Sequence, residues 1–159
     1  MMSSMRLLAL IAVACLVSAG ASAAPLPYDE AANASAEIDQ ALAASAATRK
    51  PVLLIFGANW CEDCRALDAA LHNPQNAGWV ASEFVVVKVD VGRFDKNLDI
   101  SARYANPIKK GIPAAVILSP ANRVLYATRA GELADARTMG VNGIHDFLRK
   151  AAASAGAGK

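Results

Sequence analysis

The chain has 159 residues, 55% of them hydrophobic and 19% charged, and its formal net charge is +2. This length is typical of one globular domain. Because the charge is near neutral and the basic residues are scattered, the composition gives no electrostatic reason to expect binding to nucleic acid or to an anionic membrane surface.

The first 24 residues are typical of a secretory signal peptide. Arg6 precedes an apolar run over residues 7–17, and small residues follow over 18–24. The apolar run is shorter than the roughly 20 residues that span a bilayer, and the small residues supply a cleavage site of the Ala-x-Ala type. The expected organisation is a cleaved signal peptide (1–24), an exported, periplasmic domain (25–153) and a flexible tail (154–159).

The cysteines indicate redox chemistry rather than a disulfide framework. Of three cysteines, Cys15 lies in the expected signal peptide, so the exported chain keeps Cys61 and Cys64. A disulfide between residues so close in sequence would stabilise the fold little, and we interpret the pair as chemically active. Ala12 to Cys15 weakly resembles a lipoprotein processing site, but Ala12 itself and the apolar residues after Cys15 favour an inert cysteine.

Helices and strands alternate through the first half of the expected domain. An Ala-rich segment from about 33 to 47 has Ile38 and Leu42 on one face and predicts an amphipathic helix. Four further segments are predicted by apolar runs and start signals: a buried strand over 52–56, a helix over 61–71, a helix starting at Asn73-Pro74, and a central, β-branched strand over 84–91.

The second half predicts a helix, a hairpin and a last helix. These elements cover residues 97–104 (helix), 114–118 and 123–128 (strands joined by a turn), and a helix containing Ile144 and Leu148, whereas 132–143 shows no clear pattern. Strands separated by helices pair in parallel, and the closely spaced strands pair as a hairpin. We therefore expect an α/β fold with a mixed sheet of four or five strands and helices on both faces.

The chemistry centres on Trp60-Cys61-Glu62-Asp63-Cys64, which follows the buried strand and opens a helix. A sulfur at the first turn of a helix faces unpaired backbone N–H groups and the positive end of the helix dipole. Both favour the thiolate, which is the nucleophile. We expect Cys61 to attack a partner disulfide and Cys64, one turn later on the same face, to resolve the mixed disulfide.

Four matching segments give the sequence a resemblance to the thioredoxin family. They are the strand 52–56, the motif 58–64, the strand 85–90 and Gly111-Ile112-Pro113, within a resemblance that runs from about 35 to 150. The motif helix and the Asn-Pro after it are also similar to the C-terminal domain of the bacterial transmembrane thiol–disulfide interchange protein.

The resemblance implies a thioredoxin fold and a protein thiol–disulfide oxidoreductase that binds no cofactor and uses the Cys61–Cys64 disulfide. It also implies that the Ile112–Pro113 bond is cis and lies beside the cysteines. Pro113 offers no N–H there, and the backbone of Ile112 stays free to pair with an extended partner segment. We expect Trp60, Ile112 and Pro113 to shape the surface that docks a partner protein.

Three positions depart from the family pattern. Ile55 stands where thioredoxin has a buried Asp, Ala69 stands in place of a kink-forming proline, and Lys88 matches a family lysine that would here lack its partner. The proton acceptor for the second cysteine is therefore open. The candidates are Glu62, Asp63, Lys88 and water.

Glu62 and Asp63 bear on the direction of electron flow. Acidic residues suit a first helical turn, but they also oppose a neighbouring thiolate. A less stabilised thiolate makes the dithiol a better electron donor, so we favour a reductase or isomerase over a dithiol oxidase. We expect a monomer that acts on protein disulfides and receives its electrons from a membrane donor.

Two other classes of function are open. Cys61 and Cys64 have the spacing of half a zinc or copper site, and His72 and His145 could complete it. No second pair of ligands at such a spacing follows, which argues against a metal. A thioredoxin-fold binding module without turnover is the other alternative, and the intact cysteine pair argues against that.

Overall fold

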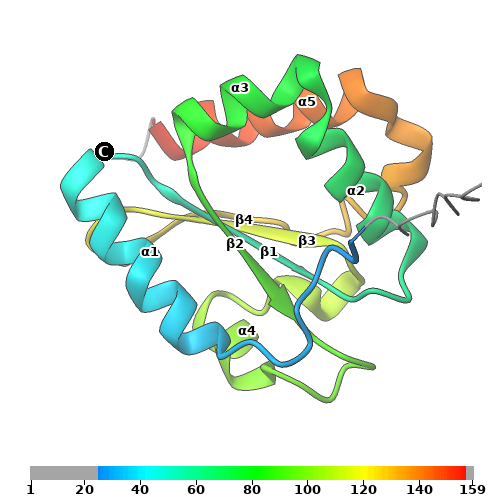
Figure 1. Cartoon of the computed structure of the whole chain (residues 1–159), viewed down its shortest axis with the longest axis horizontal. Helices are drawn as coiled ribbons and strands as arrows, with labels where there is room; N and C mark the ends of the chain where they lie inside the picture. The colour runs from blue at the N-terminus through cyan, green and yellow to red at the C-terminus, as the bar shows by residue number, and fades with distance from the viewer. Residues whose placement is uncertain (1–24, 157–159) are drawn as a thin grey trace, which may run out of the picture.

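A computed structural model describes residues 25–156 of the chain (Figure 1). The expected signal peptide, with Cys15, and residues 157–159 lie outside this range. The elements in chain order are α1 (Ala34–Thr48), β1 (Val52–Gly57), α2 (Glu62–His72), α3 (Pro74–Glu83), β2 (Val85–Asp90), α4 (Leu98–Arg103), the 3-10 turn η1 (Pro107–Lys110), β3 (Ala114–Leu118), β4 (Val124–Ala127) and α5 (Ala136–Gly156).

The described strands form one mixed sheet in the order β2-β1-β3-β4. β1 pairs in parallel with β2 and antiparallel with β3, and β3 and β4 form the expected hairpin. In Figure 1, α1 and α4 lie on one side of the sheet, and α2, α3 and α5 lie on the other. The expectation of an α/β fold with a mixed sheet covered on both faces is confirmed.

The central position belongs to β1, and the expectation that the strand over 84–91 would be central is wrong. All residues of β1 are buried, which suits a strand covered by helices on both faces. β2 forms an edge of the sheet, where Val85, Val86 and Lys88 are only partly buried. A β-branched run indicates a strand, but it does not distinguish a central strand from an edge strand.

The stretch over 132–143 is a capped turn that leads into the last helix. The Glu132 carboxylate accepts hydrogen bonds from the backbone N–H groups of Arg129 and Ala130, and Leu133 is buried. α5 then starts at Ala136 and is interrupted at Gly140, whose φ of 65° is in the left-handed region. Polar turn residues around one buried leucine give no simple periodicity, so the sequence pattern was weak.

The last helix continues further than expected. α5 runs to Gly156, so the flexible tail expected from residue 154 is helical over its first part. The reason is that Ala151 and Ala155 are buried, and these small side chains let the helix continue against the rest of the domain. Among the helices of residues 25–156, none is both long and apolar enough to cross a membrane.

Candidate active site

The cysteine pair lies where β1 passes into α2. Cys61 is the N-cap of α2, and its Sγ accepts a hydrogen bond from the backbone N–H of Cys64 at 3.1 Å. The two residues form a disulfide, with their Cα atoms 5.2 Å apart. An N-cap sulfur meets the unpaired N–H groups of the first turn, which favours its thiolate when the disulfide opens.

The two sulfurs differ in accessibility. Cys61 is 6% exposed, whereas Cys64 is 0% exposed and belongs to the buried face of α2. An external disulfide can therefore approach Cys61 but not Cys64. This asymmetry suits a nucleophile at the first position and a resolving cysteine at the second.

The loop before β3 approaches the pair from the other side. The Ile112–Pro113 peptide bond is cis, as the resemblance implied. The Ile112 carbonyl oxygen lies 3.7 Å from Cys61 Sγ. β3 runs antiparallel to β1, and this pairing brings the start of β3 beside the end of β1 and the motif that follows it.

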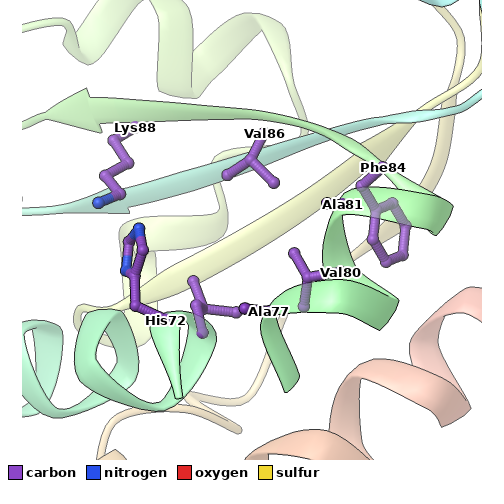
Figure 2. A pocket seen from close by; sticks show the side chains of 8 residues that line it. His72, Ala77, Val80, Ala81, Phe84, Val86 and Lys88 are labelled. Carbon is purple, nitrogen blue, oxygen red and sulfur yellow. The ribbon is translucent and has the colours of Figure 1, made fainter. Parts of the chain in front are cut away.

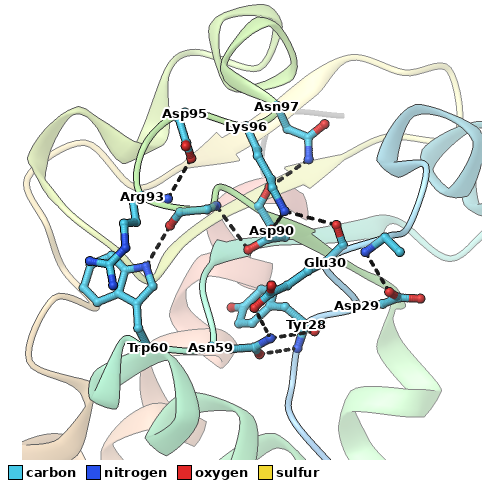
Figure 3. Close-up of polar contacts among 12 residues, drawn as sticks. Tyr28, Asp29, Glu30, Asn59, Trp60, Asp90, Arg93, Asp95, Lys96 and Asn97 are labelled. Carbon is cyan, nitrogen blue, oxygen red and sulfur yellow. Dashed lines mark hydrogen bonds and ion pairs between the residues drawn. The ribbon is translucent and has the colours of Figure 1, made fainter.

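A groove of about 500 Å³ opens above Cys61. It is lined by Trp60, Cys61, Glu62, Asp63, Phe94, Gly111, Ile112, Ala134 and Arg137. Trp60 and Phe94 are 49% and 43% exposed, and their ring centroids are 6.3 Å apart. The Trp60 Nε1–H donates to the Gly92 carbonyl at 2.8 Å, which fixes the indole at the groove wall (Figure 3).

The groove contains two residues that the sequence did not reveal. Phe94 has a φ of 64° and belongs to the loop after β2, and Arg137 is at the start of α5. Neither is part of a local motif, and each reaches the cysteine motif only through the fold. No feature of the sequence pointed to Phe94, because the exposure of its ring is seen only in the structure.

Arg137 changes the electrostatic setting of the motif. It donates to Asp63 from its backbone N–H at 3.0 Å and from Nε at 3.1 Å, and it also pairs with Glu62. The hydrogen bond to Asp63, followed by the charges of Asp63 and Glu62, raises the pKa of the Arg137 guanidinium. Each carboxylate is thus paired with a cation, which weakens the expected opposition between these carboxylates and the Cys61 thiolate.

Lys88 has a partner after all, contrary to expectation. Its ammonium group forms an ion pair with Asp68, which stands one turn after Cys64 on α2. His72 Nδ1 lies 2.9 Å from the Asp68 backbone oxygen and 3.4 Å from its carboxylate. The family pattern suggests a partner for this lysine only at position 55. A carboxylate four residues after a cysteine on the same helix face was the signal available for Asp68.

A second cavity of about 620 Å³ lies beside the edge strand β2 (Figure 2). It is lined by Leu71, His72, Ala77, Val80, Ala81, Phe84, Val86 and Lys88, and neither cysteine belongs to it. His72 is thus turned toward this cavity, while the ring of His145 packs against Trp79 at 5.0 Å between centroids. Across residues 25–156 no three His, Cys, Asp or Glu side chains are grouped to hold a metal ion.

The segment before α1 is bound to the loop that carries the motif. Asn59 accepts from the Tyr28 N–H and donates to the Tyr28 carbonyl, each at 2.9 Å, and also donates to the Glu30 carboxylate at 3.0 Å (Figure 3). Burial, followed by the negative charges of Asp68 and Asp90, raises the pKa of the Tyr28 hydroxyl well above its usual value.

Comparisons with known proteins agree with this geometry. Residues 33–120 match the family described as Thioredoxin-like. The crystal structure of a disulphide isomerase from Xylella fastidiosa Temecula1 is similar, with 53% sequence identity, a TM-score of 0.79, and coverage of 80% of this chain and 98% of that chain.

A thioredoxin from Thermus thermophilus is more distantly similar, with 22% identity, a TM-score of 0.49, and coverage of 71% of this chain and 85% of that chain. No curated protein matches the sequence. The family match covers more than half of the chain, and the Cys61–Cys64 pair forms a disulfide, which marks a thiol–disulfide oxidoreductase. The chain belongs to the thioredoxin-like family.

Proposed function

We propose that this thiol–disulfide oxidoreductase works as a reductase or isomerase of disulfides in exported proteins. The observation that carries the proposal is the closed Cys61–Cys64 pair at the rim of a groove, with its second sulfur buried. The 53% identical protein from Xylella fastidiosa is a disulphide isomerase, and this similarity supports the same class of substrate. The exchange itself requires no cofactor.

The proposed reaction starts from the dithiol form. The Cys61 thiolate attacks one sulfur of a partner disulfide, the partner S–S bond breaks, and the released sulfur leaves with the electron pair as a thiolate. The Cys64 thiolate then attacks Cys61 Sγ and releases the second partner sulfur. The partner disulfide is reduced to two thiols, and Cys61–Cys64 is oxidised. In an isomerase, a partner thiolate attacks the mixed disulfide instead and frees Cys61.

The groove supplies the surface on which a partner segment would dock. Trp60 and Phe94 offer apolar area on one wall, and the backbone of Ile112 lies beside Cys61 on the other. An extended segment could pair with that backbone while its disulfide meets Cys61, as in strand addition to a sheet edge. Pro113 supports this position because its ring leaves no competing N–H.

The proposed setting is the periplasm, which residues 1–24 support through their signal-peptide pattern. In that oxidising compartment a reductase needs a source of electrons, and we propose a membrane donor that reduces a monomeric domain. Fractionation of cells that express the chain with and without residues 1–24 tests the export step. Accumulation in the cytoplasm with the segment intact would contradict it.

The test of the activity is turnover on a protein disulfide. Reduction of insulin by dithiothreitol and reactivation of scrambled ribonuclease should both be accelerated by the wild-type protein. Cys61→Ser should abolish both activities, and Cys64→Ser should accumulate a mixed disulfide with the substrate that a reductant releases. Equal activity of Cys61→Ser and wild type would contradict the assignment of the nucleophile.

A further inference from the structure

The buried resolving cysteine lacks an evident group that would stabilise its thiolate. Cys64 is 0% exposed, and burial in apolar surroundings raises the pKa of a thiol. Ile55, a buried apolar residue of β1, offers it no hydrogen bond. A thiolate that forms here needs a hydrogen-bond donor within the protein.

Tyr28 brings a hydroxyl to this sulfur from a part of the chain outside the motif. The tyrosine is 4% exposed. A Cβ atom added to Gly57 would lie 2.2 Å from Tyr28 Oη and 2.9 Å from Cys64 Sγ, so the hydroxyl oxygen and the sulfur both border the small space beside this glycine. Gly57, at the end of β1, allows this close approach because it has no side chain.

The position of Tyr28 is fixed by the motif loop itself. Asn59 holds both the N–H and the carbonyl of Tyr28, and Lys96 Nζ donates to the Glu30 carbonyl at 3.1 Å. These contacts tie the segment to the loop before Cys61 and to the loop after β2 (Figure 3). The hydrogen bonds from Asn59 hold the backbone of Tyr28, and its side chain is buried in the core.

We propose that the Tyr28 hydroxyl donates a hydrogen bond to the Cys64 thiolate and thereby accelerates closure of the Cys61–Cys64 disulfide. The inference rests on the exchange reaction proposed above and adds a residue to it. In the oxidised state Cys64 Sγ is bonded to Cys61. Reduction frees this sulfur, and the buried hydroxyl is then beside it as a donor.

The hydroxyl acts as a donor and not as a base. Burial and nearby negative charge keep it protonated, as its raised pKa shows. The charged groups that face Tyr28 are Asp68 of α2 and Asp90 of β2. Asp68 pairs with Lys88, and Asp90 Oδ2 lies 3.2 Å from Lys96 Nζ. Tyr28 therefore does not accept the proton of the Cys64 thiol but stabilises the anion that remains.

Single-turnover reaction with dithiobis(nitrobenzoate) separates the two cysteine steps. The Cys61 thiolate attacks the reagent disulfide, forms a mixed disulfide and releases one coloured nitrothiobenzoate. The Cys64 thiolate then attacks Cys61 Sγ, closes the protein disulfide and releases the second nitrothiobenzoate. Stopped-flow absorbance of the fully reduced protein records both releases.

Tyr28→Phe removes only the hydroxyl and keeps the ring that fills the space over Gly57. We expect the second release to slow about tenfold at pH 7, since a hydrogen bond to a charged group is lost, with the first release changed by less than about twofold. The pH at which the second rate reaches half of its maximum should rise by about one unit. Tyr126→Phe, which removes a hydroxyl on β4, is the matched control and should change neither release.

The outcomes separate this inference from the proposed function. If the wild type releases no second nitrothiobenzoate, the exchange reaction itself fails. If the wild type shows both releases and Tyr28→Phe leaves the second rate and its pH profile unchanged, only the role of Tyr28 is overturned. Equal slowing of both releases would likewise overturn it, because that result indicates a general distortion of the site.

Discussion

Gly57→Ala tests how tightly Tyr28, Cys64 and the end of β1 are packed. The new Cβ atom would meet Tyr28 Oη at 2.2 Å, Tyr28 Cζ at 2.6 Å and Cys64 Sγ at 2.9 Å. All three distances are shorter than van der Waals contact, and the neighbouring groups are the buried ring of Tyr28 and the buried sulfur of Cys64. The backbone at Gly57 is that of an ordinary strand residue, so steric overlap alone decides the result.

We expect Gly57→Ala to reduce the free energy of unfolding by about 1–3 kcal/mol, the usual cost of overpacking a core. The melting temperature should fall by roughly 4 °C for each kcal/mol in a domain of this size. Chemical denaturation of the oxidised protein measures the change. Gly78→Ala is the matched control, since a Cβ at Gly78 in α3 meets nothing within 4 Å and should stabilise by about 0.5–1 kcal/mol.

A double-mutant cycle shows whether Tyr28 is the cause. In a Tyr28→Leu background, which removes the phenol, Gly57→Ala should cost at least about 1 kcal/mol less than it does in the wild type. No loss of stability in the single variant, or an equal loss in both backgrounds, would refute the packing argument.

Three further predictions concern neighbouring parts of the site. Arg137→Gln leaves two carboxylates unpaired beside Cys61, so the pKa of the Cys61 thiol should rise; the pH dependence of its alkylation measures this, and an unchanged or lower pKa would contradict the electrostatic role. Asn59→Ala leaves the backbone N–H and carbonyl of Tyr28 without their partners, and it should lower the free energy of unfolding by about 2 kcal/mol in denaturant titration. A loss no larger than that of an exposed Asn→Ala change would contradict the role of Asn59 in holding Tyr28. Burial raises the pKa of Glu132, but hydrogen bonds from backbone N–H groups outweigh burial and lower the pKa overall. Glu132 should therefore stabilise the fold above its unfolded-state pKa, and this stabilisation should disappear as the pH falls through the lowered pKa of the folded state. Glu132→Gln should be less stable than wild type at neutral pH, and the two proteins should become equally stable in acid.

The sequence predicted best what depends on local pattern. The unbroken apolar run of β1 indicated a buried strand, the Asn-Pro pair marked the start of α3, and the cysteine spacing placed Cys61 at the N-terminus of α2. Each of these follows from neighbouring residues, so no knowledge of the fold is needed to derive it.

What the sequence did not reveal depends on pairing between distant residues. Arg137 pairs with the motif across 74 residues, and Tyr28 meets Asn59 across 31. Neither partner lies in a recognisable motif. The edge position of β2 was missed for a related reason, because strand order is set by how helices cover the sheet and not by the composition of the strand.

The measurement that tests the central claim most directly is the equilibrium reduction potential of the Cys61–Cys64 pair, from titration in dithiothreitol or glutathione buffers with trapping of free thiols. We predict one reversible two-electron transition between the values of thioredoxin, about −270 mV, and protein disulfide isomerase, about −180 mV, and not near that of a strong dithiol oxidase, about −120 mV. A potential at the oxidising end would contradict the reductase or isomerase direction. Absence of any reversible transition would contradict the thiol–disulfide exchange itself.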